Sequence, residues 1–173
     1  MKMAKKLLAV VLAGVLVLSV LTGCGGAGST KAIAEAMSDK SIAEAMSDMS
    51  EEGVVYKADP ELNEKARQIA AMISSAAMQE GETDIYDKIM KIMGDDYNDK
   101  YVWIAVTTTE GCDMRTQASN LLEDVDEDSN INSKVADGKS PAAVRSIGTV
   151  PITVNGEDGC FAVITADAVE DEV

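Results

Sequence analysis

The chain has 173 residues, of which 15 are basic and 30 are acidic, so its formal net charge is −15. It contains no histidine, which excludes Ser-His-Asp and Cys-His catalysis and any zinc or haem site with histidine ligands. Its strongly negative charge argues against a surface that follows nucleic-acid phosphates, so we expect no nucleic-acid partner.

A basic start followed by a short apolar run opens the chain. Three lysines fall within the first six residues, and residues 7–21 are apolar except for a glycine and a serine. This run has 15 residues, whereas a membrane-spanning helix needs about 20. The pattern therefore predicts a secretory signal peptide over residues 1–23.

The apolar run ends in Leu-Thr-Gly-Cys at residues 21–24. This sequence resembles the lipobox of bacterial lipoproteins, in which small residues precede the cysteine that becomes acylated. The resemblance covers residues 1–24, and it implies cleavage between Gly23 and Cys24 and a lipid on the Cys24 sulfur. Two or three acyl chains would attach the protein stably, where one chain binds only marginally. An uncleaved anchor with an incidental cysteine is the alternative.

A short exact repeat follows the expected lipidation site. Ile-Ala-Glu-Ala-Met-Ser-Asp occurs at residues 33–39 and again at 42–48. A spacing of nine residues rotates a helix by about 900°, which places the two copies on opposite faces. We therefore expect short helical turns within a flexible stalk over residues 24–53, rather than one long helix with a single apolar face. A small interaction module is the alternative.

Two amphipathic helices are predicted next, over residues 60–79 and from Thr83 or Asp84 to Met93. Asp59 suits the N-cap of the first helix, and Pro60 suits its first turn. Apolar residues recur at intervals of three and four in both segments, so each helix should bury one face.

Three strands are predicted in the second half of the chain, over residues 101–109, 147–154 and 160–166. The first is rich in β-branched and aromatic residues, and the other two flank an Asn-Gly turn segment, so they should pair as a hairpin. Residues 113–122 suggest a short helix. A Pro within the second strand is typical of an edge strand or a bulge.

This order of elements predicts one globular domain of the α+β class over residues 54–173. Its N-terminal amphipathic helices would pack on a small antiparallel sheet of about three strands. The order over residues 60–166 also loosely resembles the globular heads of pilin-like proteins, in which an alanine-rich helix packs on such a sheet. That resemblance rests on no diagnostic motif.

Two cysteines remain once Cys24 is assigned to the lipid. An exported protein with an even remainder permits a disulfide, here between Cys112 and Cys160. Two free buried thiols are the alternative. Neither cysteine has a neighbouring histidine or a Cys-x-x-Cys partner, so redox or protease chemistry is not expected.

The acidic loop after residue 122 contains oxygen-bearing residues at alternating positions, which suit calcium. The set is Asp124, Asp126, Asp128, Asn130 and Asn132. This stretch resembles the calcium loop of dockerin modules, although its sixth and twelfth positions are Ser129 and Val135 rather than glycine and an acid. Without a bidentate twelfth ligand, we expect calcium to bind weakly if it binds at all. A solvated acidic loop is the alternative.

Taken together, these patterns predict a lipoprotein on the extracytoplasmic face of the cell membrane, with a non-enzymatic binding or structural role in the envelope. Its expected contacts are the membrane, through the lipid on Cys24, and an unidentified envelope protein or glycan. No cofactor is expected apart from weakly bound calcium. Two alternatives stay open: a calcium-dependent adhesion or assembly module, and a hydrolase that uses two carboxylates.

Overall fold

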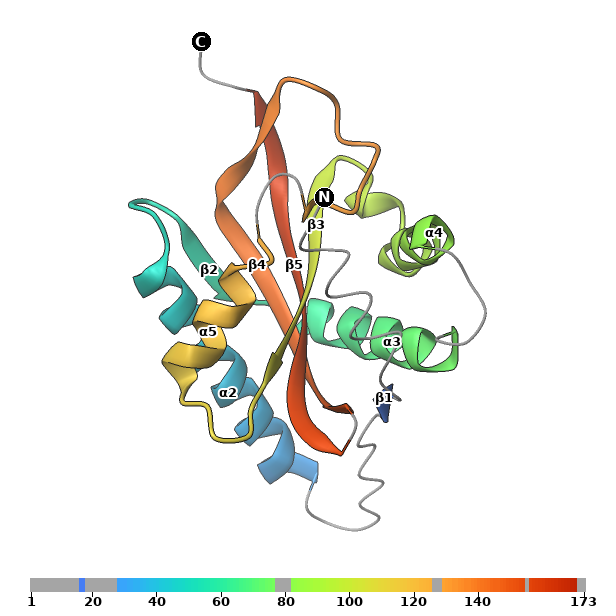
Figure 1. Cartoon of the computed structure of the whole chain (residues 1–173). Coiled ribbons are helices and arrows are strands. Elements are labelled where there is room, and N and C mark those ends of the chain that lie inside the picture. Colours follow the sequence, from blue (N-terminus) through green and yellow to red (C-terminus); the bar gives the residue numbers. More distant parts are fainter. Residues whose placement is uncertain (1–15, 18–27, 77–81, 126–128, 155, 171–173) are drawn as a thin grey trace.

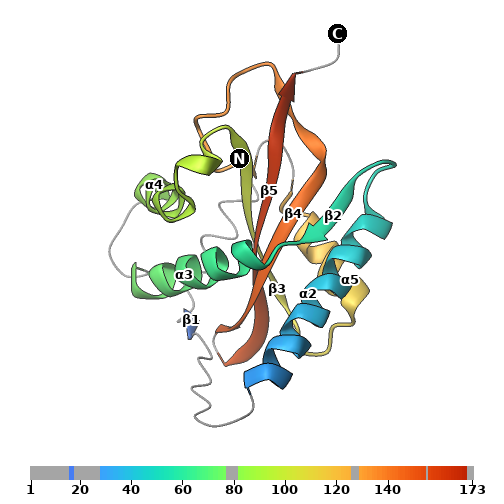
Figure 2. The same cartoon turned by 180° about the vertical axis from the view of Figure 1, so that it is seen from behind.

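The computed structural model describes residues 16–17, 28–76, 82–125, 129–154 and 156–170. In chain order the elements are β1 (Leu16–Val17), α2 (Gly28–Met49), β2 (Val55–Ala58), α3 (Pro60–Ala76), α4 (Glu82–Met93), the short 3₁₀ helix η1 (Asp95–Tyr97), β3 (Lys100–Thr108), α5 (Met114–Leu122), β4 (Lys139–Val154) and β5 (Glu157–Glu170). The arrangement is shown in Figure 1 and, from behind, in Figure 2.

The predicted α+β class is confirmed, but the sheet is larger than expected. Antiparallel β3, β5 and β4 lie side by side, and β2 adds to the outer edge of β4 in parallel. The sheet is therefore mixed and has four main strands rather than about three, with the two-residue β1 paired to the end of β4. The sequence did not reveal β2 because four residues carry little pattern and its partner lies about 90 residues away.

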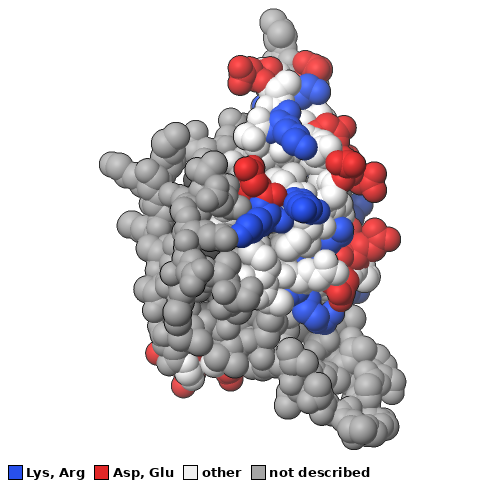
Figure 3. All heavy atoms as spheres, turned by 90° about the vertical axis from the view of Figure 1, so that its right-hand side faces the viewer, with Lys and Arg blue, Asp and Glu red and all other residues white. Residues whose placement is uncertain are grey.

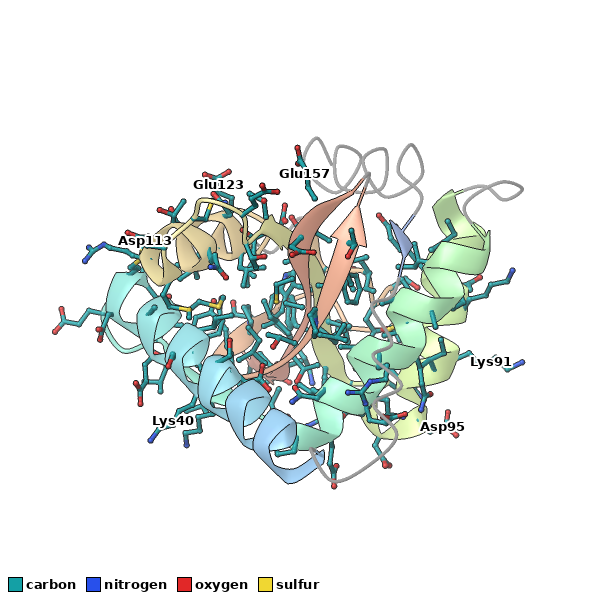
Figure 4. The ribbon with its side chains drawn as sticks, turned by 90° about the horizontal axis from the view of Figure 1, so that it is seen from below. Lys40, Lys91, Asp95, Asp113, Glu123 and Glu157 are labelled. Carbon is teal, nitrogen blue, oxygen red and sulfur yellow. The ribbon has the colours of Figure 1, made fainter. Side chains whose placement is uncertain are left out.

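Helices cover both faces of this sheet, so two separate hydrophobic cores form. The first core joins α3 and α4 to one face, and the second joins α2 and α5 to the other. Successive residues of β3 alternate between them: Val102 belongs to the first core, and Tyr101 and Trp103 belong to the second. The layering is visible in Figure 4, where Lys40 of α2 and Lys91 of α4 point outward on opposite sides.

The expected stalk is wrong for the part of it that the structure describes. Residues 28–49 form one continuous helix, and its C-terminal half packs into the second core. The buried positions are Asp39, Ile42, Ala43 and Met46, which follow the i, i+3, i+4, i+7 spacing of one helical face. This face begins in one copy of the repeat and continues into the other. A comparison of equivalent positions in the two copies therefore did not reveal this buried face. The charged side chain of Asp39 at its start also made the face look polar.

Close backbone approach fixes α3 against β4. Asp59 caps α3 as predicted, accepting from the amide of Glu61 at 2.9 Å, and its own amide donates to the carbonyl of Ile147 at 2.8 Å. One turn later, Asn63 Oδ1 accepts from the amide of Thr149 at 2.9 Å. These bonds satisfy the edge of β4 beyond its pairing with β2.

Charged residues of both signs are interspersed over the described part of the face that Figure 3 shows. Exposed ion pairs such as Arg67–Glu64 and Lys139–Glu170 belong to this kind of surface. Among the described residues, no helix has both the length and the apolar character needed to cross a bilayer.

Candidate binding pocket

A cavity of about 390 Å³ opens on the side of the sheet that carries α2 and α5. Five elements contribute to its wall: the C-terminal end of α2, β2 and the turn before it, β3, the C-terminal end of α5, and β4. Its lining consists of Met49, Ser50, Glu51, Val54, Tyr56, Trp103, Leu122, Val125, Pro141 and Arg145. Cavities of roughly 300–1,000 Å³ with mostly apolar walls and a few polar groups are typical of small-molecule sites.

An irregularity in β4 brings two of these residues to the cavity. Pro141 pairs with Ala168 and Arg145 pairs with Ala166. Between these two pairs, β4 therefore contains two more residues than β5. Bulges of this kind bend a strand and change the direction of its side chains, and they are frequent next to functional sites. The position of Arg145 therefore depends on this irregularity in β4 as well as on the pairing of β4 with β5.

The guanidinium of Arg145 lies beside two aromatic rings, those of Trp103 and Tyr56. Its guanidinium carbon lies 5.3 Å from the ring centre of Trp103 and 5.7 Å from that of Tyr56, which is within the range of a cation–π interaction. Its Nη1 donates to the Tyr56 hydroxyl at 3.0 Å. Its Nε is buried and has no hydrogen-bond partner in the described part of the chain.

The two aromatic residues beside Arg145, Trp103 and Tyr56, are held in place by neighbouring residues. Trp103 is 1% exposed and stacks on Tyr101 with ring centres 5.4 Å apart. The Tyr101 hydroxyl donates to the carbonyl of Lys139 at 2.5 Å, where β4 begins. The amide of Tyr56 donates to Ser47 Oγ of α2 at 2.8 Å. A stack within β3 and hydrogen bonds to β4 and α2 thus hold these residues in place before any ligand binds.

The side chains predicted to bind calcium are only partly described, because Asp126 and Asp128 lie in a segment that the structure leaves undescribed. Asp124 lies in the turn after α5. Asn130 Oδ1 accepts from the amides of Val102 and Asn132, at 3.0 and 3.1 Å. The Asn130 side-chain oxygen is therefore already used to hold the loop against β3.

Asn132 is 2% exposed, and its Nδ2 donates to the carbonyls of Tyr97, Asn98 and Lys100 at 2.9, 3.1 and 2.8 Å. Its Oδ1 accepts from the amide of Lys134 at 3.1 Å. This side chain ties the loop to the turn before β3. No cluster of three acidic or thiol side chains suited to a metal occurs within the described ranges. Calcium binding by this loop stays a prediction.

The two remaining cysteines are free thiols in the structure, so the suggested disulfide is not formed there. Cys112 lies in the turn between β3 and α5 and is partly exposed, whereas Cys160 is buried in β5 opposite Thr107. Burial raises the pKa of the Cys160 thiol to about 12. A thiol held protonated in this way is chemically inert near neutral pH. Gly23 and Cys24 themselves precede the first residue of α2 and lie outside the described residues.

Sequence reasoning placed Trp103 in a strand but did not identify the pocket. It missed Tyr56 because β2 was not predicted, and it missed Arg145 because the segment around it had no clear period. One signal was available: Arg145 is a single cation within a stretch of small and apolar residues that leads into a predicted strand.

Comparison with known proteins adds no relative: no protein family, curated protein or solved structure matches this chain. The pocket geometry and the lipobox resemblance are thus the basis for assigning a function.

Proposed function

We propose that this protein is a lipid-anchored, extracytoplasmic binding protein that holds a small ligand without chemically changing it. The pocket beside Arg145 and Trp103 is the observation that carries the binding role. Its lining combines apolar and polar side chains, stacked rings lie beside it, and it includes Arg145, whose Nε has no hydrogen-bond partner among the described residues. These are the ordinary features of a small-molecule site.

The membrane location rests on the resemblance of residues 21–24 to a lipobox. Cleavage there would remove three lysines and no acids, leaving 12 basic and 30 acidic residues, a formal charge of −18. Such a chain is repelled by anionic lipid headgroups, so the acyl chains on Cys24 would be its main attachment. Residues 25–27, Gly-Gly-Ala, would serve as a short flexible link to α2.

Cleavage would also remove β1, since Leu16 and Val17 belong to the signal segment. The four main strands and all the lining of the pocket lie after the cleavage site. The mature protein therefore keeps the whole candidate site.

The anchor is tested by comparing the full-length chain with Cys24→Ala in a bacterium that processes lipoproteins. We expect the wild type in the membrane fraction with an intact mass that fits cleavage before Cys24 and two or three acyl chains. Cys24→Ala should lack this mass. Equal masses and equal membrane extraction for both proteins would contradict the anchor.

The binding role is tested by native mass spectrometry of the detergent-extracted lipoprotein. Leu122→Trp fills the pocket, and Val144→Trp is a matched control because Val144 is 52% exposed on β4 and does not line the cavity. We expect a small non-covalent adduct on the wild type and on Val144→Trp, and its loss from Leu122→Trp. The same adduct on all three proteins, or none on any of them, would contradict the proposal.

A further inference from the structure

We infer that the pocket selects a small carboxylate with a flat, apolar body, and that the Arg145 guanidinium binds its carboxylate group. This inference rests on the proposed binding function and deepens it by naming the ligand class. Three observations carry it: the guanidinium edge that has no described hydrogen bond, the absence of a described ion pair at Arg145, and the apolar side chains in the remaining wall.

One edge of the Arg145 guanidinium carries no hydrogen bond to the described residues. Nη1 is used by the Tyr56 hydroxyl, and Nε has no acceptor among the described residues. In a planar guanidinium, Nε and Nη2 form one edge with two roughly parallel N–H bonds. That edge matches the two oxygens of a carboxylate in the bidentate geometry that arginine favours.

Arg145 forms no ion pair with a described residue, although the acid Glu51 also lines the cavity. The chain has twice as many acids as bases, yet Arg145 takes part in none of the described ion pairs, which join Lys40–Glu44, Arg67–Glu64, Lys100–Asp167 and Lys139–Glu170. The aromatic rings offset part of the cost of holding its charge away from water. A ligand carboxylate would supply the missing counter-charge.

One part of the remaining wall is apolar and suits an apolar ligand body, while Ser50 and Glu51 are the polar side chains of the other part. Val54, Leu122 and Val125 face the cavity together with Trp103. The Ser50 hydroxyl donates to the carbonyl of Met46 at 2.7 Å, so its hydrogen is not available to a third anionic oxygen. A carboxylate therefore fits this lining better than a phosphate, which binds through several donors. A cavity of about 390 Å³ admits a ring with a short acidic arm.

Trp103 makes this inference directly measurable, because the chain has one tryptophan. Fluorescence excited selectively at tryptophan reports on the pocket wall alone. We use phenylacetate as the probe and phenylacetamide as its neutral counterpart of the same shape, each titrated into the mature lipoprotein in neutral detergent. We expect phenylacetate to change the Trp103 emission with saturation and to bind at least about tenfold more tightly than phenylacetamide, as a charge-assisted pair requires.

Three variants separate the role of Arg145 from general effects of charge and folding. Arg145→Gln should lose the preference for phenylacetate while keeping the weak binding of phenylacetamide. Arg145→Lys keeps the charge without the planar edge, and it should bind phenylacetate more weakly than the wild type. Arg67→Gln removes an exposed arginine on α3 and should behave as the wild type.

The possible results show whether the pocket selects a carboxylate or binds rings regardless of charge. Equal affinity of the wild type for both probes, or unchanged phenylacetate binding in Arg145→Gln, would overturn the carboxylate selection and leave a pocket that binds neutral rings. No response of Trp103 to either probe would overturn this inference, whereas the adduct test with Leu122→Trp decides the binding role separately. If Arg145→Gln fails to fold, the comparison of the two probes on the wild type still decides the point.

Discussion

Gly148 in β4 lies directly against the backbone of Leu62 in α3. A Cβ atom at position 148 would overlap the carbonyl carbon and Cβ of Leu62, and it would lie 2.5 Å from the amide nitrogen of Asn63. The missing side chain lets the first turn of α3 touch the sheet. The hydrogen bonds of Asp59 and Asn63 to β4 depend on this approach.

Gly148→Ala should destabilise the protein by about 3 kcal/mol, because neither backbone segment can move aside without breaking those bonds. Urea denaturation followed by circular dichroism measures the change in the free energy of unfolding. Val144→Thr, at an exposed position of the same strand, should stay within about 0.5 kcal/mol of the wild type. A similarly small effect of Gly148→Ala would show that the contact with α3 is looser than described.

The two copies of the repeat provide a matched pair of aspartates. Asp39 is 5% exposed and accepts from Asn63 Nδ2 at 2.6 Å and from the Thr149 hydroxyl, whereas Asp48 is exposed. Asp39→Ala leaves those two donors without this acceptor, so we expect a loss of about 2 kcal/mol of unfolding free energy. Asp48→Ala should change it by less than about 0.5 kcal/mol. Equal effects of the two substitutions would mean that α2 does not pack as the structure has it.

Asn132→Asp distinguishes structural support from calcium binding in the acidic loop. The substitution replaces the Nδ2 donor, which meets three backbone carbonyls, by an oxygen that repels them. We expect a loss of about 3 kcal/mol, because the site is buried. Ser133→Asp adds the same charge at an exposed neighbouring position and should be nearly neutral.

If the loop binds calcium, the same variant should behave differently. A calcium loop should gain affinity from an added carboxylate, so Asn132→Asp would then be stabilised by millimolar calcium more than the wild type. Thermal unfolding with calcium and with a chelator measures this. The packing of Asn132 predicts that the variant stays destabilised under both conditions.

Cys160 should influence stability at alkaline pH. Its pKa is raised from 9.0 to about 12 by burial, so between these values the unfolded chain loses a proton that the folded chain retains. Its contribution to stability is therefore complete below pH 9 and is lost as the pH rises towards 12. Cys160→Ala should show a shallower decline of unfolding free energy over this interval, measured by urea titration at each pH.

Thiol labelling checks the state of the same cysteines. In Cys24→Ala protein, where two cysteines remain, a thiol reagent at neutral pH should modify one thiol in the folded state and two after denaturation. The folded-state reaction should disappear in Cys112→Ser. Two unreactive thiols that appear only after reduction would instead reveal the Cys112–Cys160 disulfide.

Local patterns were sufficient for the elements whose signal is contained in one segment. Asp59, Pro60 and the apolar spacing that follows predicted α3 because capping and amphipathicity act over neighbouring turns. The strand around Trp103 was predicted from its β-branched and aromatic content, and the strand around Phe161 from the turn segment that precedes it. The antiparallel pairing of β4 with β5 agrees with the expected hairpin.

The pocket could not be predicted in this way, because it depends on contacts between distant segments. Tyr56 and Arg145 are 89 positions apart and meet only because β2 pairs in parallel with β4. The bulge before Arg145 has no signature in its sequence. The buried face of α2 was likewise hidden, since Asp39 becomes a core residue only when Asn63 and Thr149 are in place.

The length of α2 has a consequence for a tethered molecule. At about 1.5 Å per residue, its 22 residues span about 33 Å from Gly28 to Met49, and Met49 lines the cavity. If the proposed acyl chains lie on Cys24, four residues before Gly28, this helix would separate the attachment point from the cavity by about its own length. A diffusing metabolite would then reach the cavity at a distance from the lipid headgroups.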